Sequence, residues 1–421
     1  MHTDRASRRP RASRTVPALV VLVVIVGLAP SVAAQAIPEP GGTIAYIEDR
    51  VRIRTVRPDG SDDRVVFGLT PDATSGIQGI AWRPDGQRLA FASGHEELCS
   101  IWLSDLYLVD PDGTDLVRLT NGPACATLGG LPLGTVRVTV ANTLPEPAQI
   151  LLHAQGLEMA MGAEVAAGTE STFELPVRDL GPETPQFVVA SDGGSTWFDP
   201  AVFADVRAGE VTDAGTLTLG TEPLDAWGAL SVSWSSDGSR LAYQQGLGSL
   251  WQIPAGAGPL DIGTTLLDPD ASATMSATTP TWSPTDDRIL YQRYDTTPST
   301  IDLVRADADR VGDPILPATL VNGIDWLPDG SGFIASDSSG MVERANLFLA
   351  DLRTGAVTQI TAYATGFAIW PTVSPDGRFV AYSYSPVPLD EATMLELHVR
   401  HLGTGVDRVI AANALNPDWG P

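Results

Sequence analysis

The chain has 421 residues, with 26 basic and 51 acidic side chains, and its formal net charge is −25 at pH 7. All 26 of these basic side chains are arginines, and the five histidines are counted separately as neutral. A surface this acidic repels nucleic acid and anionic membranes, so we exclude both as partners and expect a soluble monomer. The length suits two domains that each bury their own core.

Residues 1–36 have the features of a secretory signal peptide. Five arginines between Arg5 and Arg14 precede an apolar segment, Val16–Leu28, and small residues follow it at 31–36. A basic start, a short apolar core and small residues at the cleavage point are typical of such signals. The apolar core spans 13 residues, which is too short for a membrane span. We therefore expect export to the periplasm, the cell envelope or the medium.

Two alternatives stay open for this segment. An uncleaved signal would anchor the chain in the membrane instead of releasing it. Arg8-Arg9 also permits a twin-arginine export route, although the residues that follow lack the usual apolar pair, so we favour the general secretory route. With five of the 26 basic and one of the 51 acidic residues before Ile37, the chain from there on carries 21 basic and 50 acidic residues, a net charge of −29.

A block composed of an aromatic residue, a Pro-Asp-Gly-type turn and a short apolar strand recurs along the chain. One clear copy is Trp82-Arg83-Pro84-Asp85-Gly86, followed by Arg88-Leu89-Ala90-Phe91. From the second copy onward, successive copies begin 48, 44, 47 and 46 residues apart, which is the length of one four-stranded blade of a β-propeller. Short strands separated by such turns indicate hairpins rather than helices. The aromatic position is occupied, in order, by Trp82, Trp234, Trp282, Trp326, Val373 and Trp419.

The two ends of the repeat complement each other. The first blade, Gly42–Thr70, contains three strands and lacks the aromatic strand that opens the other blades, whereas Ala414–Trp419 has that strand alone. We therefore expect the last segment to supply the innermost strand of blade one. This pairing closes a ring of six blades and removes the unpaired strand edges that lead to aggregation.

These repeats resemble those of the TolB-like propellers, and similar blades occur in prolyl-oligopeptidase-type enzymes. The resemblance covers residues 42–126 and 229–421. It implies an all-β propeller fold and a role in protein interaction. The repeated residues build blades rather than sites, so the motif specifies fold much better than function.

Residues 131–224 lack the repeat but alternate like strands. Five segments show this alternation, at 135–140, 149–153, 172–177, 186–190 and 215–219. We expect a small β-sandwich inserted between blades two and three, and the segment Val206–Leu219 is similar to the closing strands of carboxypeptidase-regulatory-like sandwiches. The predicted division is a signal peptide at 1–36, blades one and two at 37–130, the insert at 131–224, and the remaining blades with the closing strand at 225–421.

Cys99 and Cys125 are the two cysteines of the chain. An even pair in an exported protein favours a disulfide. Because strands alternate in direction within a blade, the loop that contains Cys99 and the loop that contains Cys125 emerge on the same face. We expect these two residues to be bonded, with two buried thiols as the alternative.

No motif for catalysis or metal binding stands out. His95, His153, His398 and His401 are scattered over different blades and the insert, whereas a catalytic metal needs about three converging ligands. Asp-rich segments such as 58–63, 110–115 and 307–309 fit tight turns, because a complete calcium loop ends in a bidentate acid that they lack. Neither a Gly-x-Ser-x-Gly motif nor a glycine-rich phosphate loop is present. We expect no cofactor, with calcium in an Asp-rich turn as the alternative.

Loops opposite the Pro-Asp-Gly turns are the predicted binding surface, since propellers hold variable loops on a rigid scaffold. We expect an exported, non-enzymatic protein that uses this face to bind a protein, a peptide or a cell-envelope glycan. The first alternative is an enzyme of the channel mouth, a polysaccharide lyase or hydrolase, and the second is a carbohydrate-binding insert on a structural propeller. The candidate binding residues are His95, Glu96, Glu97, Tyr294, Asp295, Glu343, Arg344, Asp390 and Glu391.

Overall fold

A computed structural model describes most of the chain after the predicted signal peptide, and the part that it describes consists of strands and connecting turns without helices. Accordingly, no helix in this part is long and apolar enough to cross a membrane. The described residues are 39–69, 76–96, 100, 104–120, 129–157, 160–181, 186–191, 197–219, 223–224, 228–246, 248–257, 263–267, 276–294, 300–305, 313–317, 322–337, 344–387 and 394–421.

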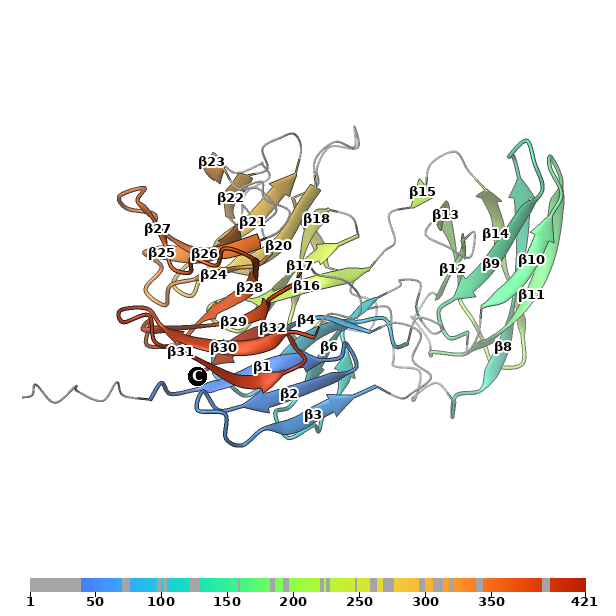
Figure 1. The fold of residues 1–421 in the computed structure, drawn as a ribbon. Coiled ribbons are helices and arrows are strands. Elements are labelled where there is room, and N and C mark those ends of the chain that lie inside the picture. Colours follow the sequence, from blue (N-terminus) through green and yellow to red (C-terminus); the bar gives the residue numbers. More distant parts are fainter. Residues whose placement is uncertain are drawn as a thin grey trace, which may run out of the picture. The chain divides into compact units, whose positions relative to one another are not determined.

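Six antiparallel four-stranded groups, the predicted blades, follow one another among the described residues (Figure 1). From the innermost to the outermost strand, blade one is β32 (Ala414–Gly420), β1 (Thr43–Glu48), β2 (Arg52–Val56) and β3 (Arg64–Gly68), and blade two is β4 (Ile77–Trp82), β5 (Leu89–Ser93), β6 (Asp105–Val109) and β7 (Val117–Arg118). Blade three is β16 (Ala229–Trp234), β17 (Arg240–Gln245), β18 (Ser249–Pro254) and β19 (Thr264–Leu267), and blade four is β20 (Ser276–Trp282), β21 (Arg288–Tyr294), β22 (Thr300–Arg305) and β23 (Asp313–Pro317). Blade five is β24 (Ile324–Trp326), β25 (Gly332–Asp337), β26 (Arg344–Asp351) and β27 (Val357–Gln359), and blade six is β28 (Gly366–Val373), β29 (Phe379–Ser385), β30 (Glu396–His401) and β31 (Asp407–Ala412). A short parallel pairing of β26 with β28 joins these two blades into one eight-stranded sheet.

The ring closes as the sequence predicts. Strand β32 pairs antiparallel with β1, and Trp419 lies opposite Ile44. The innermost strands β4, β16, β20, β24, β28 and β32 contact one another in a closed cycle. The last strand of the chain and the first strand of the repeat therefore belong to one blade, which confirms the predicted closure of the ring.

The burial of each strand follows its place in the blade. The second strand of blade two is buried along its whole length, because neighbouring blades cover both of its faces, and its apolar sequence is continuous for the same reason. The outermost strand β27 of blade five is exposed at each of its three residues. Clusters of buried apolar side chains join blade one to blade two and blade two to blade three, so the core lies between blades.

In blades two to six, the Pro-Asp-Gly-type turn that follows the aromatic position joins the first and second strands. In blade two the Asp85 carboxylate accepts a hydrogen bond from Gln87 N at 3.0 Å, and Gly86 has φ 69°, a left-handed conformation that suits glycine. A side chain at Gly86 would also press on Pro421 at 3.1 Å. This turn therefore lies directly against the end of the chain.

Strands between blades two and three form two sheets of their own. Buried side chains from both sheets, including Val138, Leu152, Leu175 and Val188, share one apolar cluster. The first sheet consists of β10 (Met161–Val165), β9 (Ala148–Ala154), β12 (Gln186–Ser191), β13 (Trp197–Ala204) and β15 (Pro223–Leu224), and the second consists of β11 (Glu170–Arg178), β8 (Leu133–Asn142) and β14 (Val211–Leu219).

Candidate functional site

The innermost strands of the six blades surround a cavity of about 600 Å³, which is within the usual size range of ligand sites. Three aligned positions of the repeat account for most of its lining. The inner ring is the residue directly before the repeat's aromatic position: Ala81, Ser233, Thr281, Asp325, Thr372 and Asp418. The bulge layer lies two residues earlier: Gly79, Ser231, Thr279, Gly323, Trp370 and Asn416. The proline layer follows the aromatic position by two: Pro84, Ser236, Pro284, Pro328, Pro375 and Pro421.

Side chains of the inner ring link each blade to the next. Ser233 Oγ accepts a hydrogen bond from Trp282 N at 2.9 Å, and Thr372 Oγ1 accepts one from Trp419 N at 2.9 Å. At Ala81, which has no acceptor in its side chain, the backbone oxygen instead accepts the indole N–H of Trp234 at 3.1 Å. At this position of the repeat, a single hydroxyl group is therefore enough to join two blades, and Ala81 does so without any side-chain acceptor.

Two members of the inner ring are carboxylates. Asp325 accepts hydrogen bonds from Trp326 N at 2.8 Å and from Val373 N at 2.7 Å, and Asp418 accepts one from Trp82 N. Neither carboxylate takes part in an ion pair of the described residues. Together they give the cavity a negative charge that no arginine in the described part of the chain neutralises by direct contact.

Their position perturbs the protonation of both groups. The pKa of Asp325 is raised to about 7, first by enclosure within the channel and then by the charge of Asp418, against the opposing effect of the hydrogen bonds from Val373, Trp326 and Thr372. Enclosure likewise raises the pKa of Asp418 to about 6, against the hydrogen bond from Trp82. Carboxyl groups with perturbed pKa values in a cavity are typical of functional sites.

The bulge layer contains strained backbone. Thr279, Trp370 and Asn416 have φ values of 51°, 50° and 44°, a left-handed conformation that costs a non-glycine residue roughly 1–3 kcal/mol. Gly323 adopts positive φ at the same position of the repeat without such a cost. Strain that persists at three aligned positions around one cavity suggests that their side chains serve the site.

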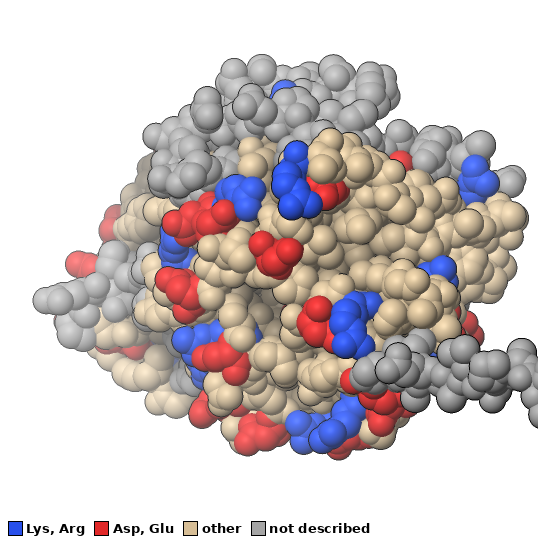
Figure 2. Space-filling view, turned by 90° about the vertical axis from the view of Figure 1, so that its left-hand side faces the viewer, with Lys and Arg blue, Asp and Glu red and all other residues tan. Residues whose placement is uncertain are grey.

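Arginines near the proline layer stack on the indole rings of the repeat. The guanidinium of Arg240 lies 4.8 Å from the ring centre of Trp282, and that of Arg288 lies 5.0 Å from Trp326. Arg240 also pairs with Asp287 at 2.8 Å. Figure 2 shows basic and acidic side chains interspersed on one face around a largely uncharged centre. These arginines hold blades together and leave the charge of the inner ring uncompensated.

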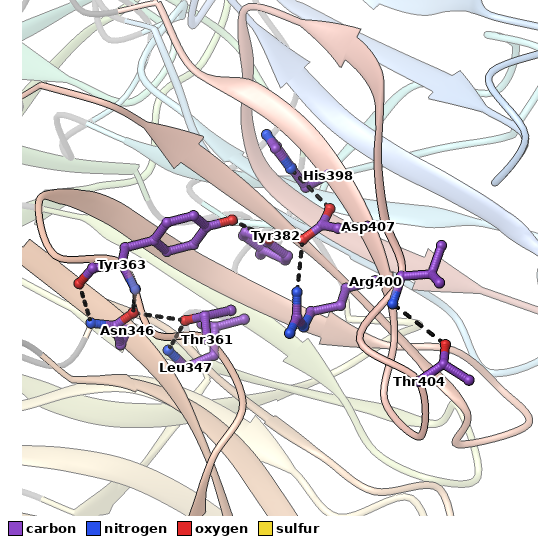
Figure 3. Close-up of polar contacts among 10 residues, drawn as sticks. Asn346, Leu347, Thr361, Tyr363, Tyr382, His398, Arg400, Thr404 and Asp407 are labelled. Carbon is purple, nitrogen blue, oxygen red and sulfur yellow. Dashed lines mark hydrogen bonds and ion pairs between the residues drawn. The ribbon is translucent and has the colours of Figure 1, made fainter. Parts of the chain in front are cut away.

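A polar cluster in blade six has the residue types of a catalytic site (Figure 3). His398 Nδ1 lies 3.0 Å from Asp407, Arg400 Nη1 lies 3.4 Å from it, and Tyr382 donates a hydrogen bond to the same carboxylate. Tyr363 and Tyr382 share a hydrogen bond of 2.8 Å. Burial opposes ionisation of Asp407, but the hydrogen bonds from His398 and Tyr382 outweigh it and lower the pKa.

An equivalent cluster in blade one indicates that the blade-six cluster stabilises its blade. Tyr46 donates a hydrogen bond to Asp63 at 3.0 Å, and Arg54 Nε donates to Asp63 at 2.9 Å. Arg54 lies opposite Tyr46 in the strand pairing, as His398 lies opposite Tyr382. Since arginine replaces histidine without changing the arrangement, its common purpose is to satisfy a buried tyrosine hydroxyl and to hold the outermost strand.

Two of the residues predicted from the sequence pack into blade two. The ring of His95 lies 4.5 Å from that of Tyr107, and its Nδ1 lies 3.0 Å from Ser93 Oγ; burial lowers its pKa. Glu96 accepts hydrogen bonds from Tyr107 at 3.1 Å and from Arg118 at 3.4 Å. These contacts give both residues a structural role in the blade.

The remaining predicted residues are spread over other blades or are not described. Arg344 begins strand β26 of blade five, and Tyr294 ends strand β21 of blade four. The structure therefore does not bring His95 and Arg344 onto the same blade. Outside the described residues lie Glu97, Asp295, Glu343, Asp390, Glu391, the predicted Cys99–Cys125 disulfide and the predicted signal peptide at 1–36.

Reasoning from the sequence missed the channel residues Asp325, Asp418 and Trp370. A usable signal was present, because Asp325 and Asp418 each directly precede the repeat's aromatic residue. Aligning that single position across the copies would have placed both carboxylates in one ring. Among the described residues, no group of three or more His, Cys, Asp or Glu side chains is placed to hold a metal ion.

The closed ring of four-stranded blades is a β-propeller. No model of a protein family matches the chain, and no curated protein matches it. A crystal structure of TolB from Acinetobacter baumannii is 13% identical over 91% of this chain and 68% of that one, with a TM-score of 0.49. A nidogen/laminin complex structure is 8% identical over 90% and 99%, with a TM-score of 0.48. A prolyl endopeptidase structure is 12% identical over 90% and 49%, with a TM-score of 0.41.

Proposed function

We propose that this protein is an exported, non-enzymatic binding protein that takes a protein or peptide ligand at the mouth of its central channel. The observation that carries the proposal is the cavity of about 600 Å³, at which Thr279, Trp370 and Asn416 hold left-handed backbone. Proteins keep such strain at sites where it positions side chains for a ligand. The signal-like segment at 1–36 supports export, and we propose that the sheets within residues 131–224 form a separate inserted domain.

Catalysis has less support than binding. The carboxylates of the inner ring, Asp325 and Asp418, both accept backbone hydrogen bonds that join blades. His398 is the histidine whose contacts most resemble those of a catalytic site, but Arg54 takes the same place in blade one, which indicates a structural role. A glycan ligand on the insert is the remaining alternative, and the exposed Phe203 ring, 61% accessible, gives that surface an aromatic side chain of the kind that packs on sugars.

Site-specific photocrosslinking tests the proposal. Benzoylphenylalanine would replace Trp370 in the channel, Phe203 in the insert, or Val357 on the exposed outermost strand of blade five as the matched control. Expressed in a native envelope, the Trp370 variant is expected to yield a defined crosslinked protein that the Val357 variant does not. Crosslinks from Phe203 alone, or equal products from all three positions, would overturn the proposal.

A further inference from the structure

We infer that the inner ring of the channel is a subsite for a positively charged nitrogen group, the guanidinium or ammonium of a basic side chain of a peptide ligand. The inference rests on the proposed function and names the chemistry that the channel would recognise. Its basis is the pair Asp325 and Asp418, which occupy aligned positions on β24 and β32 and both line the cavity.

The repeat itself shows that a carboxylate exceeds what the blades require. Ser233 and Thr372 make the same link to the next blade through a single hydroxyl, and Ala81 has no side-chain acceptor at all. Thr281 occupies the position in blade four. Two aspartates among six such positions therefore add negative charge to the channel without being needed to join its blades.

Both carboxylates retain capacity to accept further hydrogen bonds. A carboxylate offers about four lone-pair sites. Asp418 uses one for Trp82 N, and no donor in the described part of the chain bonds its Oδ1. Asp325 accepts from two backbone N–H groups and from Thr372. Enough sites remain for a guanidinium or ammonium donor, and hydrogen bonds between charged partners are about twice as strong as neutral ones.

The electrostatic setting also selects a cation. Arg83, the arginine that lines the cavity, already pairs with Asp85 at 3.4 Å and lies 5.8 Å from the ring centre of Trp234. The protein as a whole carries a net charge of −25, which draws cations toward it. The negative charge of Asp418 disfavours ionisation of Asp325, and a bound cation relieves that repulsion. The partly exposed indole of Trp370 adds a face suited to a cationic group.

The test compares a charged probe with a neutral probe of the same shape. Nα-acetyl-arginine methylamide and its citrulline analogue would be titrated into the full chain at pH 8, with binding followed by calorimetry. We expect the arginine probe to bind at least tenfold more tightly than the citrulline probe, because its guanidinium is charged and forms a stronger hydrogen bond to a carboxylate than the neutral urea group of citrulline does. Added salt is expected to weaken the arginine probe selectively.

The variant Asp325→Thr/Asp418→Thr removes both charges and installs the residue that blades four and six already use. It is expected to lose at least tenfold in affinity for the arginine probe, and each single variant is expected to show part of that loss. Asp112→Thr, which removes an exposed turn carboxylate of blade two that does not line the cavity, is the matched control and should bind within twofold of the parent.

Equal binding of the two probes, or full retention of arginine binding by the double variant, would overturn the inference. The crosslink from Trp370 keeps the two proposals separate. If that crosslink persists in the double variant while the arginine probe shows no charge preference, the channel binds its partner but does not select a cation.

Discussion

Replacing Thr279 with glycine should stabilise the protein even though it removes a side chain from the channel. Thr279 has φ 51°, and its Oγ1 is buried without a hydrogen-bond partner among the described residues. Relief of the backbone strain should raise the unfolding free energy by roughly 1–2 kcal/mol, and loss of the unpaired hydroxyl should raise it by about 1–3 kcal/mol. Glycine costs about 0.5–1 kcal/mol in chain entropy, and the lost methyl group costs about 1 kcal/mol. The net effect is an increase of about 2 kcal/mol in the unfolding free energy.

Urea unfolding followed by tryptophan fluorescence measures this gain as a higher midpoint at an unchanged slope. Ser231→Gly is the matched control, because Ser231 occupies the same position of the repeat in blade three without a left-handed backbone. That variant should lose about 0.5–1 kcal/mol. If Thr279→Gly destabilised the protein as much as Ser231→Gly does, the strain argument for the bulge layer would be refuted.

Two further predictions concern the tyrosines of the polar clusters in blades one and six and the carboxylates of the inner ring. Tyr382→Phe and Tyr46→Phe should each lower the unfolding free energy by about 1–2 kcal/mol, as measured by urea unfolding. Both variants should leave binding of the arginine probe unchanged, as measured by calorimetry. A binding defect in Tyr382→Phe alone would mean that the blade-six cluster belongs to a binding site. The second prediction concerns pH. Because the folded pKa of Asp325 is about 7 and that of Asp418 about 6, both above the usual 3.8, the folded state holds their protons more tightly. Their contribution to stability is therefore complete below about pH 4 and is lost as the pH rises through 6 and 7. Relative to the parent, Asp325→Thr/Asp418→Thr should gain roughly 2–4 kcal/mol in unfolding free energy between pH 5 and pH 8, and a constant difference across that range would contradict the assignment.

The propeller could be predicted from the sequence because its signal is repeated. Each copy of the turn and the apolar strand after it is ambiguous alone, but a spacing in the mid-forties admits few architectures. The closing strand was predictable for the same reason, since one blade lacked its aromatic strand and the chain end had it alone. The pairing of Trp419 with Ile44 confirms that inference.

The candidate site was harder to predict than the fold, because polar residues in loops are the usual candidates for binding on a rigid propeller. His95 and Glu96 are polar residues in a loop, yet they bond to Ser93 and Tyr107 within blade two. Their orientation depends on which buried hydroxyl needs a partner, and a sequence does not show this. The channel residues, by contrast, lie within strands and are separated by many residues, so only superposition of the copies brings them together. Left-handed backbone at Trp370 has no sequence signal, since tryptophan rarely adopts it.

The repeat also provides an internal standard for judging function in a chain that matches no family model. Every blade solves the same structural problem, so a residue type shared by aligned positions reflects blade construction, and a departure from it calls for another explanation. By this criterion the His398–Asp407 pair is structural, because Arg54 and Asp63 repeat it in blade one. The carboxylates Asp325 and Asp418 are different, because Ser233 and Thr372 at the same ring position make the link to the next blade through a hydroxyl. The same comparison, applied inside one chain, thus discards the group that looks most catalytic and retains two aspartates that no motif would have selected.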